Sequence, residues 1–215
     1  MAERIATGET MEPPIETKGQ RTARRIMDVA ETLFAQQGYE GTTLRQIAAA
    51  AKLQEPGLYN HFDSKQALYE AILHRGLHPM LDALSRHLAQ AADLRDYTDL
   101  PAVMTDLLLD HPQMAALFQQ AMQGEPESVG NQMVQEWLKN LFGYGIKSMS
   151  ASSAAEDTDA RSLAINVIAM FNLTTGYFLS QRAFNMMAEG SLVHPDNVAR
   201  QKRLLRRVIR AMLIS

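Results

Sequence analysis

The sequence predicts an all-α fold, made of a small N-terminal helical module and a larger C-terminal helical bundle. Apolar residues recur at helical spacing in every long segment, and no alternation of Val, Ile or Thr bounded by turns is found. The first predicted helices also follow one another so closely that no room is left for strands. With 215 residues, of which 46% are hydrophobic, the chain can bury one sizeable core or two small ones.

Composition excludes several classes of function. The chain has no cysteine, which excludes disulfides, thiolate metal sites and cysteine nucleophiles. It also lacks the motifs GxxxxGK[ST] and GxGxxG, so we expect no nucleotide cofactor, and no other cofactor is indicated. The first residues show no apolar run, so we expect no secretory signal and a cytoplasmic protein. The most apolar stretch, 163–179, is interrupted by Asn and Thr, and we expect a buried helix there and no membrane span.

The chain is expected to begin with a flexible arm followed by a helix. Residues 1–17 contain Gly and Pro and show no periodicity. Helical spacing then places one apolar stripe on a helix over 20–37, with these members: Ile26, Val29, Ala30, Leu33 and Phe34. Gly38 stands where a left-handed residue would end this helix.

Two short helices follow. Thr43 and Gln46 have the spacing of a capping box, which predicts a helix over 44–51. After a turn of three residues, the stretch 55–62 has room for barely two helical turns, with Pro56 in a permitted early position.

The remaining helices are punctuated by Pro, Gly and Ser. Asp63 and Gln66 predict another capping box, opening a helix over 64–77 that ends before Pro79. Beyond it, helical spacing predicts further helices over these ranges: 80–92, 100–109, 112–123, 128–147, 161–188 and 195–213. We therefore expect an N-terminal module over 18–78 and a bundle over 79–215.

The two short helices and the helix before them have the pattern of a helix-turn-helix, whose second short helix enters the DNA major groove. Small or apolar residues occupy the positions where these helices must approach closely: Ile47, Ala48, Ala51, Leu53 and Leu58. The net charge of −3 argues against nucleic acid, but residues 17–77 hold eight Lys or Arg against six Asp or Glu. The charge balance therefore permits DNA binding without requiring it.

The stretch TTLRQIAAAAKLQEPGLYNHFDSKQALYEAIL resembles the TetR family of bacterial transcription regulators. The resemblance covers residues 20–75, and the rest matches only as an all-helical layout. Two positions depart from the family pattern: Lys52 stands where a Gly commonly makes the left-handed turn, and Gln54 where Ser or Thr commonly caps the recognition helix. The residues that carry the resemblance are Thr43, Ile47-Ala48, Leu58-Tyr59-Asn60-His61-Phe62 and Lys65.

Chemistry and the resemblance together imply a set of DNA contacts. Thr43 offers a hydroxyl and helix N-terminal N–H groups to a phosphate, and Arg45 could reach either a guanine edge or a phosphate. Gly57 would let the backbone approach DNA, and Glu55 could accept from cytosine N4. The resemblance implies contacts with the DNA backbone or bases for Tyr59 and His61, and a contact with a phosphate for Lys65. The full predicted set is Arg21, Thr43, Arg45, Glu55, Gly57, Tyr59, His61 and Lys65.

Some of these residues have structural alternatives. Tyr59 could be a core aromatic, although Leu58 and Phe62 already supply apolar side chains there. Arg21 and Arg24 could form a solvated helix face, or they could contact phosphate or the minor groove.

Three other patterns are weaker. His74 and His78 have the i, i+4 spacing of metal ligands, but no Glu of an HExxH motif lies between them, so we expect no metal site. No Ser lies in a GxSxG turn, and no catalytic constellation indicates an enzyme. An arginine stripe on the last helix favours a solvated face over a second nucleic-acid surface: Arg200, Arg203, Arg207 and Arg210.

The helix over 161–188 is apolar on two faces and so needs two partners. One face holds Ala164, Val167, Phe171, Thr174 and Phe178, and the other holds Ile165, Ile168, Asn172, Thr175 and Leu179. One partner is the helix's own bundle. The other is expected to be a second subunit, because in the TetR family the last two helices form a four-helix dimer interface. We therefore expect a homodimer through 161–188 and 195–213.

The bundle also has the composition of a small-molecule site, although ordinary core packing explains any single Met equally well. Apolar walls with a few polar groups are usual in such sites. No Arg or Lys lies between Arg95 and Lys139, which favours a neutral aromatic, lipid-like or cationic ligand. The predicted ligand-binding residues are Met104, Leu108, Phe118, Met122, Trp137, Phe171, Asn172 and Thr175.

The function expected from this sequence is that of a sequence-specific DNA-binding regulator. We expect a repressor that a small apolar or amphipathic effector releases from double-stranded operator DNA. The alternative is an all-helical ligand-binding or scaffold protein, in which the N-terminal helices serve packing alone.

Overall fold

The structure is a computed structural model that describes residues 16–90, 96–150 and 159–214. Every regular element within these ranges is helical, which confirms the all-α prediction. The predicted arm over 1–17 falls almost wholly outside the described residues, and so do residues 151–153 of the Ser-rich stretch 148–153. The elements are α1 (Lys18–Gly41), α2 (Leu44–Ala50), α3 (Glu55–Tyr59), α4 (Lys65–Gln90), a 3₁₀ turn η1 (Asp96–Asp99), α5 (Leu100–Asp110), α6 (Gln113–Gln123), α7 (Val129–Ser150), α8 (Ala160–Leu179), α9 (Gln181–Met187) and α10 (Pro195–Ile214).

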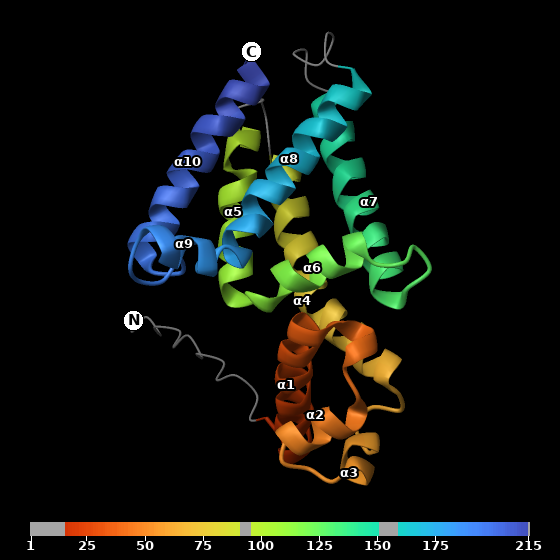
Figure 1. The fold of residues 1–215 in the computed structure, drawn as a ribbon. Coiled ribbons are helices and arrows are strands. Elements are labelled where there is room, and N and C mark those ends of the chain that lie inside the picture. The colour runs from red at the N-terminus through yellow and green to blue at the C-terminus, as the bar shows by residue number, and fades with distance from the viewer. Residues whose placement is uncertain (1–15, 91–95, 151–158, 215) are drawn as a thin grey trace, which may run out of the picture.

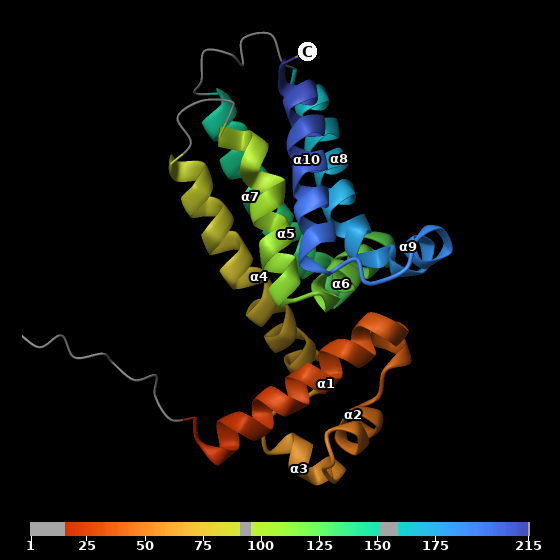
Figure 2. The same cartoon turned by 90° about the vertical axis from the view of Figure 1, so that its left-hand side faces the viewer.

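The molecule has a small body at one end and a larger bundle at the other. The small body contains α1, α2, α3 and the start of α4, and the bundle contains the rest (Figure 1). Turning the molecule shows that α4 runs from one body into the other, and that α8 and α10 lie together on the side of the bundle opposite α4 (Figure 2).

Helix α1 begins and ends as local chemistry dictates. Thr17 and Gln20 form a capping box at its start. Gly38 has the expected positive φ of 77°, but its ψ of 168° differs from the left-handed helical cap that was predicted, and helical geometry is interrupted there. The Thr42 hydroxyl then donates to the Gly38 carbonyl at 2.8 Å, which fixes the path into α2.

Helix α4 differs from the prediction at its start and in its length. Ser64, and not Asp63, caps the helix, because the Ser64 hydroxyl oxygen accepts from the Ala67 amide at 3.0 Å. The predicted break at Pro79 was wrong, since one helix continues to Gln90. Pro79 removes one backbone hydrogen bond, but buried residues on both sides of it, among them Leu77 and Met80, hold the helix in the core.

The predicted helix 161–188 is divided at Ser180 into α8 and α9. The Ser180 amide donates to the Tyr177 carbonyl, and its hydroxyl donates to the Gly176 carbonyl at 2.6 Å. These local bonds compete with the regular helical pattern and end α8.

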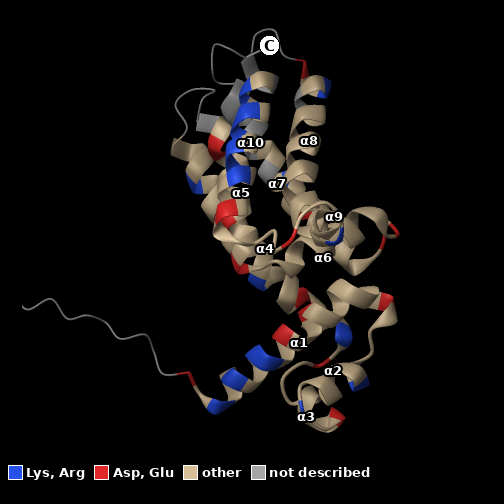
Figure 3. Cartoon of the chain, turned by 60° about the vertical axis from the view of Figure 1, so that its left-hand side comes forward, with Lys and Arg blue, Asp and Glu red and all other residues tan. Residues whose placement is uncertain are grey.

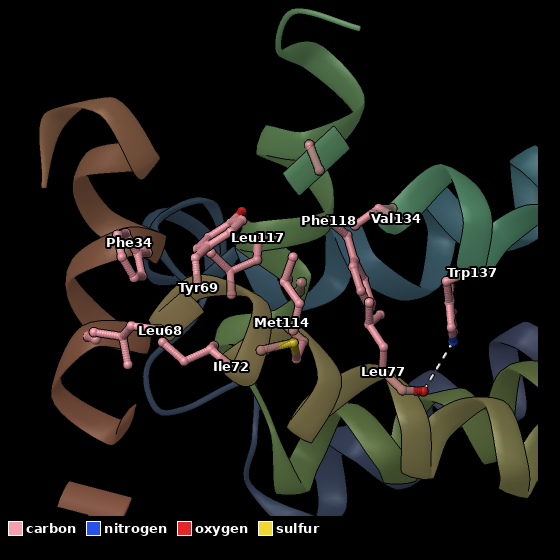
Figure 4. Packing of buried hydrophobic residues seen from close by; sticks show 14 of the residues in the cluster. Phe34, Leu68, Tyr69, Ile72, Leu77, Met114, Leu117, Phe118, Val134 and Trp137 are labelled. Atoms are coloured by element: carbon pink, nitrogen blue, oxygen red, sulfur yellow. Dashed lines mark hydrogen bonds between the residues drawn. The ribbon is translucent and has the colours of Figure 1, made fainter. Parts of the chain in front are cut away.

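One apolar core is shared by the two bodies. Buried side chains form a continuous cluster from Ile26 in α1 to Leu138 in α7. Figure 4 shows how it passes from Phe34 through Ile72 and Met114 to Trp137. The helices of the small body are therefore packed directly onto the bundle.

Helix α8 is more exposed than expected. Only 12% of its most apolar window is buried, so the prediction of a buried helix was wrong for the single chain. By length and composition it is apolar enough to cross a membrane, a test that core helices of water-soluble proteins also pass. Its exposed apolar side chains include Ile165, Ile168, Leu173 and Leu179, whereas Thr174 and Thr175 are buried.

Candidate nucleic-acid interface

The turn between α2 and α3 has the geometry of a helix-turn-helix. Lys52 has φ 56° and is the one non-glycine residue with positive φ among the described residues, which confirms its predicted left-handed position. The Leu53 amide donates to the Ala48 carbonyl at 2.8 Å and closes the end of α2. Gln54 precedes α3 without a side-chain capping bond, as its departure from the family pattern implied.

Small buried residues hold α2 and α3 together. Ile47, Ala51 and Leu58 are completely buried, and Ala48 is 2% exposed. A larger side chain at Ala48 would push the helices apart, because close-packed interiors have no spare volume. This apolar contact fixes the direction in which α3 projects.

Most of the predicted DNA contacts lie at the surface of this module. Arg21, Arg45 and Glu55 are exposed, and Gly57, His61 and Lys65 are partly exposed. Tyr59 is 48% exposed, so it does not belong to the core. The module thus presents polar and aromatic side chains outward while its apolar side chains pack inward.

Thr43 is already used in the fold. It forms the predicted capping box with Gln46, since its hydroxyl oxygen accepts from the Gln46 amide at 3.2 Å and its own amide donates to Gln46 Oε1 at 2.8 Å. What Thr43 offers a phosphate is therefore chiefly the N-terminal end of α2, where free N–H groups favour an anion.

Lys65 is held at the start of α4 by an aromatic ring. Its Nζ lies 4.2 Å from the centre of the Tyr39 ring, which is a favourable cation–π position. Tyr39 in turn stacks on Phe34 and contacts Tyr69, with ring centres 5.8 and 4.9 Å apart. Burial, followed by the charges of Glu40 and Glu70, raises the pKa of Tyr39 above its usual value, so the ring stays neutral under the ammonium.

The first half of α1 is basic. Figure 3 shows its Lys and Arg residues along the free end of the helix, with acidic residues further on. Arg24 pairs with Glu16 at 2.9 Å, so part of its charge is neutralised at a solvent-exposed position. The local positive charge therefore suits this end of α1 to an anionic partner, although the net charge of the whole chain is negative.

An ion pair that the sequence did not reveal joins α4 to α1. Arg75 contacts Asp28 at 2.6 Å and also pairs with Glu31, which is only 6% exposed. These partners are 47 and 44 residues from Arg75 in the sequence, so no local spacing marks them.

The predicted ligand-binding residues are only partly brought together. Phe118 stacks on Trp137 and contacts Phe171, with ring centres 5.2 and 5.8 Å apart, and we call these three residues the aromatic cluster. Met104, Leu108 and Thr175 are also buried, although the Thr175 hydroxyl already donates to the Phe171 carbonyl at 2.8 Å. Met122 and Asn172 are exposed in the single chain and do not lie with these buried residues, so their part in a ligand site stays a prediction.

The weaker sequence patterns have structural explanations. The His74 and His78 rings lie 5.0 Å apart, but His78 pairs with Asp82, and the described residues contain no group of three or more potential ligands placed to hold a metal ion. On α10 the stripe of arginines is exposed, and the opposite face is buried through Val198, Leu205 and Ile209. This is an ordinary amphipathic helix.

An exposed helix-turn-helix carried on a helical bundle is an architecture of DNA-binding transcription regulators. The family described as "Bacterial regulatory proteins, tetR family" matches residues 26–72, which include α2, α3 and the turn between them. Residues 26–72 therefore carry the DNA-binding module of the TetR family of transcription regulators.

Two curated regulators are similar to part of this chain. The transcriptional repressor KstR2 of Rhodococcus jostii is 36% identical over 85 residues, which are 39% of this chain and 42% of that protein. The negative regulator IcaR of the Staphylococcus aureus biofilm operon is 50% identical over 46 residues, which are 21% and 25% of the two chains. The chain therefore spans less than half the length of the curated relatives it matches.

Solved structures match nearly the whole fold. A TetR-family regulator from Bordetella parapertussis has a TM-score of 0.66 at 18% identity, covering 85% of this chain and 93% of that one. The regulator FadR of Bacillus subtilis, solved in complex with stearoyl-CoA, has a TM-score of 0.62 at 13% identity, covering 86% and 96%. At these identities the likeness shows the fold of the bundle.

Proposed function

We propose that this protein is a transcriptional repressor that binds operator DNA as a homodimer. The observation that carries the proposal is the exposed recognition surface of the helix-turn-helix. There Arg45, Tyr59 and Lys65 lie outside a fully buried apolar frame, an arrangement that packing alone does not require. The repressors KstR2 and IcaR, to which part of this chain is similar, support the same assignment. A site of action in the cytoplasm follows from it.

The open face of α8 supports dimerisation. Ile165 and Ile168 are 65% and 53% exposed, and Leu204 on the neighbouring α10 is 51% exposed. A second copy docked on α8 and α10 would remove this apolar surface from water, which stabilises association. It would also set the two recognition helices at the spacing of two operator half-sites, roughly 34–36 Å or a multiple of it.

The effector we propose is a molecule with a long apolar chain, of which a fatty acyl-CoA is the leading example. The aromatic cluster and the buried Met104 and Leu108 supply apolar contacts. No Arg or Lys lies between Arg95 and Lys139, so an anionic head group would have to stay outside this part of the bundle. The stearoyl-CoA complex of the FadR relative supports the same class of ligand.

The proposed mechanism is a shift in population. Ligand in the bundle favours an arrangement of α4 in which the two recognition helices no longer match the half-site spacing, and operator affinity falls. A differential binding energy of about 1–3 kcal/mol between the two arrangements is enough for this coupling.

The test is a titration of fluorescently labelled DNA from the protein's own upstream region, at several salt concentrations. We expect saturable binding that Lys65→Ala weakens for all sequences, with a salt slope reduced by about 1. Arg86→Ala, which removes an exposed charge from the bundle part of α4, is the matched control and should leave binding unchanged. A folded protein that bound no more tightly to this DNA than to unrelated DNA would instead support the scaffold alternative.

A further inference from the structure

Helix α4 has a weak point where it passes from the DNA module into the bundle. Pro79 has no amide hydrogen, so the Arg75 carbonyl one turn earlier loses its helical partner. Proline is also a recognised cause of bending in helices. The part of α4 before Pro79 carries the ion pairs to α1, and the part after it lies in the bundle.

Three contacts hold the DNA side of this weak point against the bundle. Tyr69 packs on Gly130 of α7, where an added Cβ would lie 2.5 Å from the Tyr69 hydroxyl. Met114 of α6 packs on Gly76, where an added Cβ would lie 2.8 Å from Met114 Cγ. The third contact is polar and directional, because the Trp137 indole N–H donates to the Leu77 carbonyl at 3.1 Å (Figure 4).

Trp137 contacts both the aromatic cluster of the bundle and α4. Its ring stacks on Phe118 with an interplanar angle of 17°, and Phe118 contacts Phe171 of α8. Trp137 is only 5% exposed, so a molecule entering the aromatic cluster could not displace Phe118 without disturbing the indole. Its hydrogen bond reaches α4 two residues before Pro79.

We propose that Trp137 is a positioning residue that couples the aromatic cluster to the DNA module through its hydrogen bond to the Leu77 carbonyl. The bond fixes the DNA side of α4 at the point where Pro79 weakens the helix. Loss of the bond frees that side to reorient, and the Arg75 ion pairs carry the movement into α1. This inference rests on the proposed function, because it assigns the path by which an occupied bundle changes operator binding.

The first experiment needs neither DNA nor effector. Trp137→Phe keeps an aromatic ring beside Phe118 but removes the N–H together with the second ring of the indole. Amide hydrogen exchange over 65–78 should then rise about fivefold, as expected for one lost buried hydrogen bond. Phe171→Leu is the matched control: it alters the same cluster without touching Leu77, and it should leave exchange in this segment unchanged. Equal exchange in the two variants would overturn the proposal even if the protein represses transcription.

The second experiment uses the natural chain, in which Trp137 is the only tryptophan. Because coupling is reciprocal, saturating operator DNA should shift the tryptophan emission and the single indole ¹H–¹⁵N resonance. In Trp137→Phe, the loss of operator affinity caused by stearoyl-CoA should shrink at least fivefold relative to the natural chain. An indole resonance that DNA leaves unmoved would contradict the coupling. Absence of DNA binding altogether would defeat the proposed function, and hydrogen exchange alone would then decide the role of Trp137.

Discussion

Arg75 of α4 pairs with the buried Glu31 of α1, and the same guanidinium contacts the exposed Asp28 at 2.6 Å. The Arg75 Nε atom is buried without a hydrogen-bond partner, so only the two terminal nitrogens of the guanidinium hold the side chain in place. This ion pair ties the helix that enters the bundle to the helix that supports the helix-turn-helix.

Arg75→Ala should therefore destabilise the protein strongly. The substitution leaves the Glu31 carboxylate buried without a counter-charge, which typically costs about 3–5 kcal/mol. Urea denaturation followed by far-UV circular dichroism measures the change. The double variant Arg75→Met, Glu31→Leu should recover most of the stability, because it removes both charges. A single variant as stable as the natural chain would show that Glu31 is not desolvated.

Lys52→Gly should stabilise the protein. Lys52 is exposed and makes the left-handed turn between α2 and α3 at φ 56°, so its side chain loses no packing when removed. Relief of the strain should add about 0.5–1 kcal/mol to the free energy of unfolding, reduced in part by the greater freedom of Gly in the unfolded chain. Thermal unfolding checks this, and a lower midpoint for Lys52→Gly would contradict it.

Features set by neighbouring residues could be predicted from the sequence, and features set by distant ones could not. The Thr43–Gln46 capping box and the positive φ of Gly38 follow from local chemistry, and the positive φ of Lys52 follows from the resemblance to the TetR pattern; these three predictions are confirmed. The prediction that Asp63 caps α4 was wrong. The adjacent Ser64 offers an equivalent side-chain oxygen atom and makes the capping bond.

Tertiary contacts explain the remaining differences. Pro79 continues within a helix because the core holds both sides of it, which no local rule predicts. The bond between Trp137 and Leu77 joins residues 60 positions apart, so it becomes visible only once α7 is packed on α4. Periodicity identifies the two apolar faces of α8 without telling which face its own bundle covers, so the exposure of Asn172 in the single chain could not be predicted.

The stability of the protein should fall at high pH through Tyr69. Burial, followed by the neighbouring Tyr39, raises the pKa of Tyr69 to about 12 from its usual value of 10.0. Below pH 10 the tyrosine is protonated in both folded and unfolded states, and its contribution is fully present. As the pH rises from 10 to 12 the unfolded chain loses this proton more readily than the folded chain does. The free energy of unfolding should therefore fall by roughly 2–3 kcal/mol.

Urea denaturation between pH 8 and pH 11, with Tyr69→Phe as the reference, isolates this effect from the other tyrosines. The phenylalanine variant should lose less stability over the same interval. Parallel losses in the two proteins would show that Tyr69 titrates normally.

Dimerisation should be sensitive to a charge on the open face of α8. Ile168→Asp alters a side chain that is 53% exposed in the single chain, so the subunit should still fold. In a dimer the charge would be buried twice by symmetry, weakening association at least 100-fold, as expected for unpaired charges in an interface. Sedimentation velocity at micromolar concentration measures it. Ala89→Asp changes an exposed residue of α4, the helix on the side of the bundle opposite α8 and α10, and this variant should remain a dimer (Figure 2). A natural chain that sediments as a monomer would remove α8 from the proposed interface.

Gly57→Ala separates the needs of the fold from those of DNA binding. A Cβ at Gly57 would meet no atom within 4 Å, and the residue lies inside α3, where alanine favours the helix by about 1 kcal/mol. The variant should therefore be at least as stable as the natural chain. If the backbone of α3 approaches DNA at this residue, the added methyl group should nevertheless weaken operator binding about tenfold or more, because it keeps the helix from its contact distance. Thermal unfolding and DNA titration on the same preparation measure both effects. Full operator affinity in Gly57→Ala would mean that α3 meets the groove through its other face.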